Sequence, residues 1–86
     1  MLGDKVIYKF SKNVLRECKF LPMLVVYKYP EDYPKDFVIR LFDADSPTPY
    51  VMLLDSYAEV EGAIPHEMFL FPRHGDDDKC IVETYL

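Results

Sequence analysis

The sequence predicts an α+β domain with a mainly antiparallel sheet and one short helix packed on it. Short apolar segments rich in β-branched and aromatic residues recur along the chain, separated by turns that contain proline or acidic residues. A single segment carries a strong helix-start signal. The 86 residues have the length of one domain, so residues 1–86 are assigned to a single domain.

Five segments are predicted as strands, and the expected order along the chain is ββ, β, α, ββ. Their composition is apolar, β-branched and aromatic, and they span residues 23–29, 37–43, 50–54, 68–71 and 80–86. The seven residues between the first two strands predict an antiparallel hairpin with a long turn. Residues 44–49 are expected to be a loop, because Pro47 and Pro49 each lack an N–H group.

The predicted helix begins at Ser56 and ends at Pro65. Ser56 and Glu59 have the spacing of a capping box, and Tyr57, Val60 and Ile64 recur at helical intervals. About two helical turns are not stable alone in water, so this helix must pack on the sheet.

Residues 1–22 are interpreted as a possible N-terminal extension with its own strand or helix. Residues 6–10 alternate weakly, as a short strand does. Ser11 offers an N-cap for a helix over residues 13–19, which would turn Val14, Leu15 and Cys18 inward.

Alternation along the two longest strands indicates that the second face of the sheet is half apolar. Its side chains are Val25, Tyr27 and Tyr29 in one strand and Val38, Arg40 and Phe42 in the other. An antiparallel sheet with one solvated face shows a polar stripe there instead. Three covers for this second face remain open: residues 1–22, a second copy of the chain, or a partner protein.

Charge is distributed unevenly along the chain, whose net charge is −5. Residues 1–40 carry eight basic and five acidic side chains (net +3), whereas residues 41–86 carry two basic and ten acidic ones (net −8). An acidic half repels phosphate and favours a basic protein partner. Direct nucleic-acid binding is therefore not expected, although basic and aromatic residues interleave over residues 8–20.

Targeting signals are lacking. The longest apolar run, residues 20–27, is far shorter than the roughly 20 residues of a membrane span, and the N-terminus has no apolar core of a signal peptide. These patterns predict a cytoplasmic protein without a membrane segment, in which Cys18 and Cys80 stay reduced.

Catalytic and metal motifs are incomplete wherever they begin, so we expect no enzyme, no metal and no cofactor. Asp43 and Asp45 resemble the D-x-D-x-T/V motif of haloacid-dehalogenase-like phosphatases, but Pro47 replaces the last residue. His66-Glu67 opens an H-E-x-x-H motif, but Leu70 stands where the second histidine is needed. His74 and the three following aspartates form no complete zinc or calcium pattern.

One segment carries a family resemblance. Tyr29-Pro-Glu-Asp-Tyr-Pro-x-x-Phe37-Val-x-Arg40-Leu41, together with Pro49-Tyr50-Val51 and the helix at 55–65, resembles small uncharacterised bacterial and phage proteins over about residues 25–86. By analogy of size and charge alone, the chain is similar to phage-encoded inhibitors such as anti-CRISPR proteins. The analogy implies an inhibitor that engages a basic surface of a nucleic-acid enzyme.

Together these observations favour a small acidic non-enzymatic protein-binding module with a basic protein partner. The expected partner-binding residues are Tyr27, Tyr29, Glu59, Glu61, Glu67, Asp76, Asp77 and Asp78. The alternative is a homodimeric structural or regulatory protein that uses the half-apolar sheet face.

Overall fold

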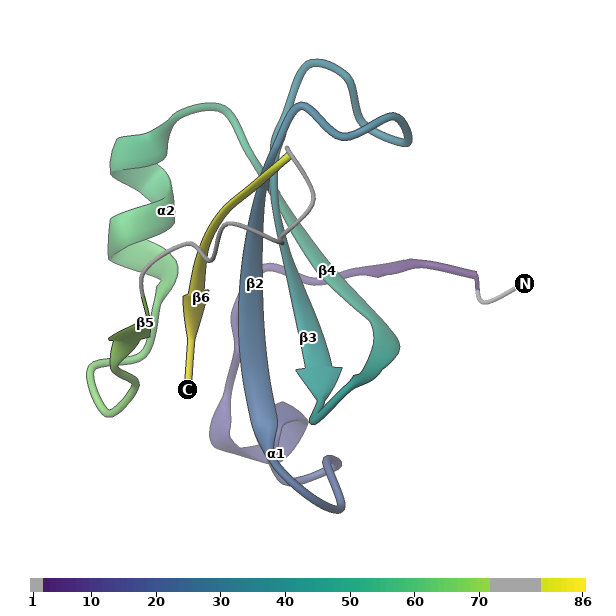
Figure 1. Ribbon diagram of the computed structural model, residues 1–86, viewed down its shortest axis with the longest axis vertical. Helices are drawn as coiled ribbons and strands as arrows, with labels where there is room; N and C mark the ends of the chain where they lie inside the picture. Colours follow the sequence, from purple (N-terminus) through teal and green to yellow (C-terminus); the bar gives the residue numbers. More distant parts are fainter. Residues whose placement is uncertain (1–2, 72–79) are drawn as a thin grey trace.

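A mixed sheet forms the centre of this small α+β domain, seen in a computed structural model that describes residues 3–71 and 80–86 (Figure 1). Over the described residues the strands are β1 (Lys5–Val6), β2 (Pro22–Lys28), β3 (Phe37–Asp43), β4 (Ser46–Leu54), β5 (Leu70–Phe71) and β6 (Ile81–Tyr85). They lie side by side in the order β1-β4-β3-β2-β6-β5. The pair β1–β4 is parallel and the other neighbours are antiparallel.

Strands β2, β3 and β4 form the middle of the sheet, and their alternation decides which side chains meet. Leu24 lies opposite Leu41, and Val26 lies opposite Ile39, which in turn pairs with Met52. All five side chains are buried, and they define the core face of the sheet. The predicted hairpin of two long strands is confirmed.

The predicted loop at residues 44–49 is wrong, because β4 already begins at Ser46. Ala44 has a φ of 54° and forms, with Asp45, a two-residue connection between β3 and β4. The two prolines are tolerated because β1 pairs with β4 only at Tyr50 and Val51, so residues 46–49 form an open edge. Proline occupies edge positions where no strand needs its N–H.

The N-terminal segment contains both a strand and a helix, and the helix α1 (Lys12–Leu15) is shorter than the predicted 13–19. Ser11 caps α1 as expected, with its side chain accepting a hydrogen bond from the Val14 N–H. The chain leaves the helix early because Asp43 binds the N–H groups of the residues that follow, Lys19, Phe20 and Leu21, at 2.7–3.0 Å. These charge-assisted bonds compete with a further helical turn.

Helix α2 (Tyr57–Ala63) confirms Ser56 as the predicted N-cap, but Glu59 departs from the capping box because it binds the N–H of Asp55 instead of that of Ser56. Ser56 Oγ accepts a hydrogen bond from the Glu59 N–H, and the Glu59 carboxylate reaches back to the Asp55 N–H, each at 3.4 Å. Val60 is completely buried against the core face. The helix therefore lies on the sheet, as its marginal length requires.

Both α2 and the N-terminal segment cover the core face. Around its centre pack partly buried apolar side chains from residues 7–18, from α2 and its following turn, and from β6: Ile7, Val14, Leu15, Cys18, Ala63, Ile64, Met68, Val82 and Tyr85. Phe10 is itself buried in this core. Residues 7–18 thus pack on the same face as α2, and not over the second face.

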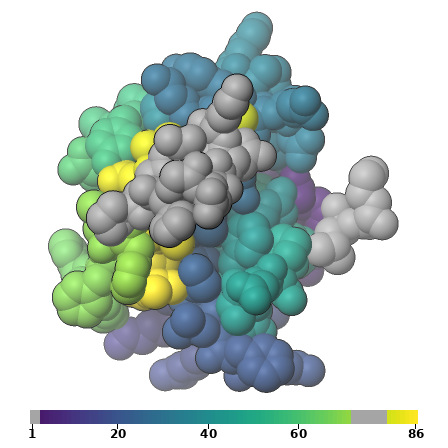
Figure 2. Space-filling view, viewed as in Figure 1, coloured from purple at the N-terminus to yellow at the C-terminus, as the bar shows by residue number. Residues whose placement is uncertain are grey.

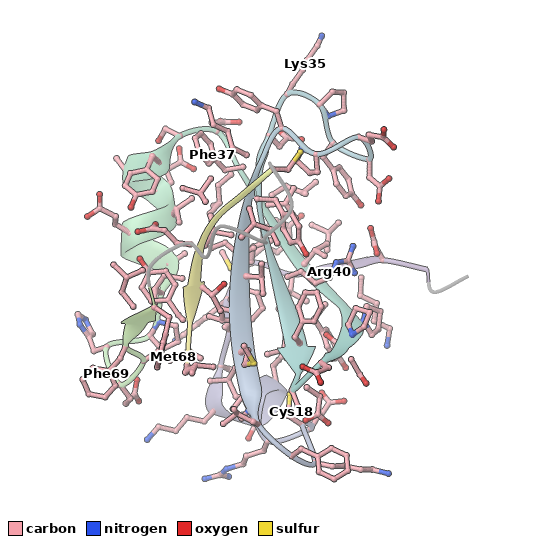
Figure 3. The ribbon with its side chains drawn as sticks, in the orientation of Figure 1. Cys18, Lys35, Phe37, Arg40, Met68 and Phe69 are labelled. Atoms are coloured by element: carbon pink, nitrogen blue, oxygen red, sulfur yellow. The ribbon has the colours of Figure 1, made fainter. Side chains whose placement is uncertain are left out.

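Among the described residues, part of the connection between β2 and β3 lies against the second face. Val25, Val38 and Val51 are buried there. Tyr33, from the connection, donates a 2.7 Å hydrogen bond to Asp4, and Asp4 forms a 2.9 Å ion pair with Arg40 of β3 (Figure 3). Of the N-terminal residues proposed as a cover, Asp4 reaches this face.

The C-terminal strand β6 is inserted between β2 and β5. Phe69 and Leu86 exchange both backbone hydrogen bonds, at 2.8 and 3.0 Å, just outside the β5–β6 pairing. The fourth predicted strand, residues 68–71, is thereby reduced to Leu70–Phe71. β5 forms one border of the sheet and β1 the other.

Candidate functional site

Helix α2 divides the predicted acidic residues between two different surfaces. Glu59 lines a groove between α2 and the N-terminal segment, and Glu67 lines the same groove. Glu61 does not line this groove and lies toward Tyr57 and Tyr85. The pKa of Tyr57 is raised mainly by its hydrogen bond to Glu83 and that of Tyr85 mainly by burial, and the charge of Glu61 adds a smaller contribution to both. The acidic residues that looked like one surface in the sequence therefore face two neighbourhoods.

The groove has an apolar floor and a volume of about 750 Å³. Buried Phe10 and Met52 form part of this floor. One wall is built by the segment before and at the start of α1, with Tyr8, Lys9, Ser11 and Lys12. The opposite wall is built by α2 and its following turn, with Glu59, Gly62, Ala63, Ile64, Pro65, His66 and Glu67.

The two walls of this groove carry opposite charges that do not neutralise each other. Lys9 and Lys12 are exposed on one wall, and Glu59 and Glu67 are exposed on the other. Among residues 3–71 and 80–86, the one ion pair joins Arg40 to Asp4. The lysines of the groove therefore form no ion pair with its glutamates. An amphipathic occupant could therefore contact both charges and the apolar floor.

The other side of α2 holds a cluster of tyrosine hydroxyls around Glu83. Tyr57 donates a 2.5 Å hydrogen bond to the Glu83 carboxylate, and Tyr85 donates a second one at 3.4 Å. The bond to Glu83 raises the pKa of Tyr57 strongly, and burial followed by the charge of Glu83 raises the pKa of Tyr85. Both hydroxyls therefore stay protonated, and Glu61 and Glu83 give this side a negative charge.

Three consecutive apolar side chains are exposed at the border strand next to this cluster. Phe69 is 75% exposed, Leu70 is 51% exposed and Phe71 is 48% exposed. Leu70 pairs with Tyr85, whose pKa is raised by burial and by the charges of Glu83 and Glu61, so Leu70 lies on the side of this negative charge. Phe69 and Phe71 point to the opposite face of the strand. Figure 2 shows α2 and β5 (green) next to β6 (yellow) on one side of the molecule, and in Figure 3 Phe69 points away from the sheet.

The structure does not bring Tyr27 and Tyr29 to the groove. Tyr27 lines a small cavity of about 160 Å³ on the second face, together with Tyr33, Val38 and Arg40. Tyr29 follows β2 with a φ of 51°, and its ring packs 5.5 Å from that of Phe37. Asp76, Asp77 and Asp78 lie outside the described residues.

The two cysteines of the described part are free thiols, and one of them has a shifted pKa. Burial, with the nearby charges of Asp43 and Glu17, raises the pKa of the Cys18 thiol, which makes it a weak nucleophile. Cys18 and Cys80 form no disulfide. Among residues 3–71 and 80–86, no three His, Cys, Asp or Glu side chains gather to hold a metal ion. None of the described helices is long and apolar enough to cross a membrane.

Sequence reasoning missed the β5 border and one wall of the groove. In the sequence, Lys9 and Lys12 belong to a segment in which basic and aromatic residues interleave, and no pattern there predicts that they lie opposite α2. The run Met68–Phe71 did contain a signal, because three consecutive large apolar residues cannot all point to one face of a strand.

Comparisons with protein-family models, with curated proteins and with solved structures found no match to this chain. The resemblance described for residues 25–86 therefore stays a prediction.

Proposed function

We propose that this protein is a non-enzymatic binding module that takes up an extended, basic segment of a partner protein along β5. The observation that carries the proposal is the outward backbone of Leu70. Because Phe69 and Leu86 exchange both of their hydrogen bonds, the next residue, Leu70, directs its N–H and C=O away from β6. An extended segment can pair with such a border strand by strand addition.

Side chains around β5 favour a partner segment that is both apolar and basic. Phe69, Leu70 and Phe71 offer apolar contacts on the two faces of the strand, and buried apolar and aromatic contacts supply most of the affinity at interfaces. Glu61 and Glu83 add negative charge nearby. The described residues from 41 onward contain no lysine or arginine that would oppose this charge.

A basic partner is further supported by the way complementary charge acts in association. Opposite charges accelerate encounter and disfavour partners of the same charge. Enzymes that act on nucleic acids carry basic surfaces, so a phage or mobile-element inhibitor of such an enzyme is one form that this function would take.

The test is capture of partner proteins from cells of origin on the immobilised protein. We expect retention at about 50 mM salt and release at about 500 mM, because salt screens the charge contribution. Leu70→Pro removes the outward N–H without removing a β5–β6 hydrogen bond, and it should abolish retention. Leu70→Thr keeps the N–H and should retain the same proteins.

Charge is tested separately by Glu61→Lys, with Glu31→Lys as the matched control in the connection between β2 and β3. Both carboxylates are exposed, and both substitutions replace a glutamate with a lysine, so they change the net charge equally. Glu61→Lys should weaken retention and Glu31→Lys should not. Equal retention by the normal chain and by Leu70→Pro would show that β5 is not the binding strand.

A further inference from the structure

The groove between α2 and the N-terminal segment is a separate surface from β5, and its two walls are complementary to each other. A surface whose halves carry opposite charges can bind a rotated copy of itself. In a two-fold interface, each contact between two positions occurs twice, once in each direction. The lysine wall of one protomer would then face the glutamate wall of the other.

Tyr8 stands at the rim of this groove with almost its whole side chain in solvent. It is 90% exposed, and no hydrogen bond or ring contact holds it within the described part of the chain. A tyrosine loses little side-chain entropy when it is immobilised, and it provides a large apolar surface with a polar tip. The apolar floor formed by Phe10 and Met52 suits such a ring.

Gly62 gives an independent indication that something approaches α2 closely from outside. A glycine within a helix costs about 1 kcal/mol relative to alanine. The structure gives no internal reason for it, since a Cβ at Gly62 would meet no atom within 4 Å and its φ is not positive. Gly62 lines the groove, where a missing side chain lets a ring lie against the helix backbone.

We propose that the groove is the interface of a symmetric homodimer. Tyr8 of each protomer enters the groove of the other and packs near Gly62. Lys9 and Lys12 of each protomer face the partner's Glu59 and the partner's Glu67. The second copy is favoured over other occupants because it supplies an exposed aromatic ring and lysines on one wall, and the complementary glutamates on the other wall.

The test measures molecular mass by analytical ultracentrifugation over a range of protein concentrations at low salt. The normal chain should approach twice the 10.1 kDa of one chain. Tyr8→Ala should raise the dissociation constant of the dimer by about 30-fold or more, which is typical of a central aromatic contact. Phe20→Ala is the matched control, because Phe20 is 83% exposed and does not line the groove.

Reversing the charge of one groove wall at a time tests whether the lysines of one protomer face the glutamates of the other. One variant carries Lys9→Glu and Lys12→Glu, and the other carries Glu59→Lys and Glu67→Lys. Each variant alone should be monomeric, because both of its walls have the same charge. An equal mixture of the two should form heterodimers, since every contact across the interface is then attractive.

Gly62→Ala distinguishes an effect on folding from an effect on dimerisation. It therefore tests the interface even if the charge variants fold poorly. It should raise the thermal stability of the monomer while weakening the dimer. The proposal is overturned if the normal chain is monomeric at all concentrations. It is also overturned if the mixed charge variants stay monomeric although both are folded, or if the dimer is unaffected by Tyr8→Ala. A monomer that binds a small amphipathic molecule in the groove would count against it in the same way.

Discussion

The two faces of the sheet are both buried, but different kinds of contact close them. On the core face, apolar side chains from α2 and from residues 7–18 cover Leu24, Val26 and Ile39. On the second face, the valines lie beside a polar cluster in which Asp4 joins Tyr33 to Arg40. The centre of the core face should therefore be most sensitive to loss of packing volume, whereas the polar cluster of the second face should depend on pH and salt.

The largest expected effect is that of Ile39→Ala on the core face. Ile39 is completely buried at the centre of the core, and truncation of such a side chain costs about 2–5 kcal/mol. Val38→Ala, the next residue on the second face, removes two methyl groups and should cost about 1.6 kcal/mol. Urea unfolding of both variants measures the difference. An equal or larger loss for Val38→Ala would contradict the distinction between the faces.

Asp43→Asn should have the next largest effect, because it disturbs a carboxylate that accepts hydrogen bonds from three consecutive N–H groups of the N-terminal segment. The N–H groups of Lys19, Leu21 and Phe20 lower the pKa of Asp43 below 3.8, so its stabilising effect is present above about pH 4 and is lost as the pH falls further. The melting temperature of Asp43→Asn should therefore approach that of the normal chain in acid. Asp45→Asn, in the same turn, should change little at any pH.

Ser56→Ala tests how α2 is held on the core face. Loss of an N-cap hydroxyl costs about 1 kcal/mol, because one N–H of the first turn loses its acceptor. Ser46→Ala, at an exposed position of β4, is the control. Chemical unfolding compares the two, and no loss for Ser56→Ala would mean that packing of Val60 alone fixes the helix.

Asp4→Asn should have the smallest effect, about 0.5–1 kcal/mol at neutral pH, because the cluster on the second face is partly exposed. Burial raises the pKa of Asp4, but the hydrogen bonds from Tyr33 and Arg40 outweigh it and lower the pKa below 3.8. The effect should therefore be full above about pH 4, vanish in acid, and shrink in high salt. A difference that is independent of pH would mean that the cluster contributes only shape.

The features that the sequence predicted correctly are those made by neighbours along the chain. The N-cap contact joins Ser56 to the N–H of Glu59, three residues later, and alternation along β2 separates Leu24 and Val26 on the core face from Val25 on the second face. The prediction of a loop over residues 44–49 failed, because a proline is compatible with a strand that has no neighbour on one side. Whether β4 has such a neighbour at these residues depends on where β1 pairs with it.

Local sequence thus determined the main strands, α2 and the overall charge of the chain, because hydrogen-bonding capacity and hydrophobic periodicity are properties of short segments. The tertiary structure alone decided that Lys9 and Lys12 stand opposite Glu59 and Glu67, and that Asp43 binds the N–H groups of residues more than 20 positions away. It also decided that β5 became a border of the sheet. Each of these contacts depends on strand order, which is set by the packing of the whole core and has no signature within any single segment.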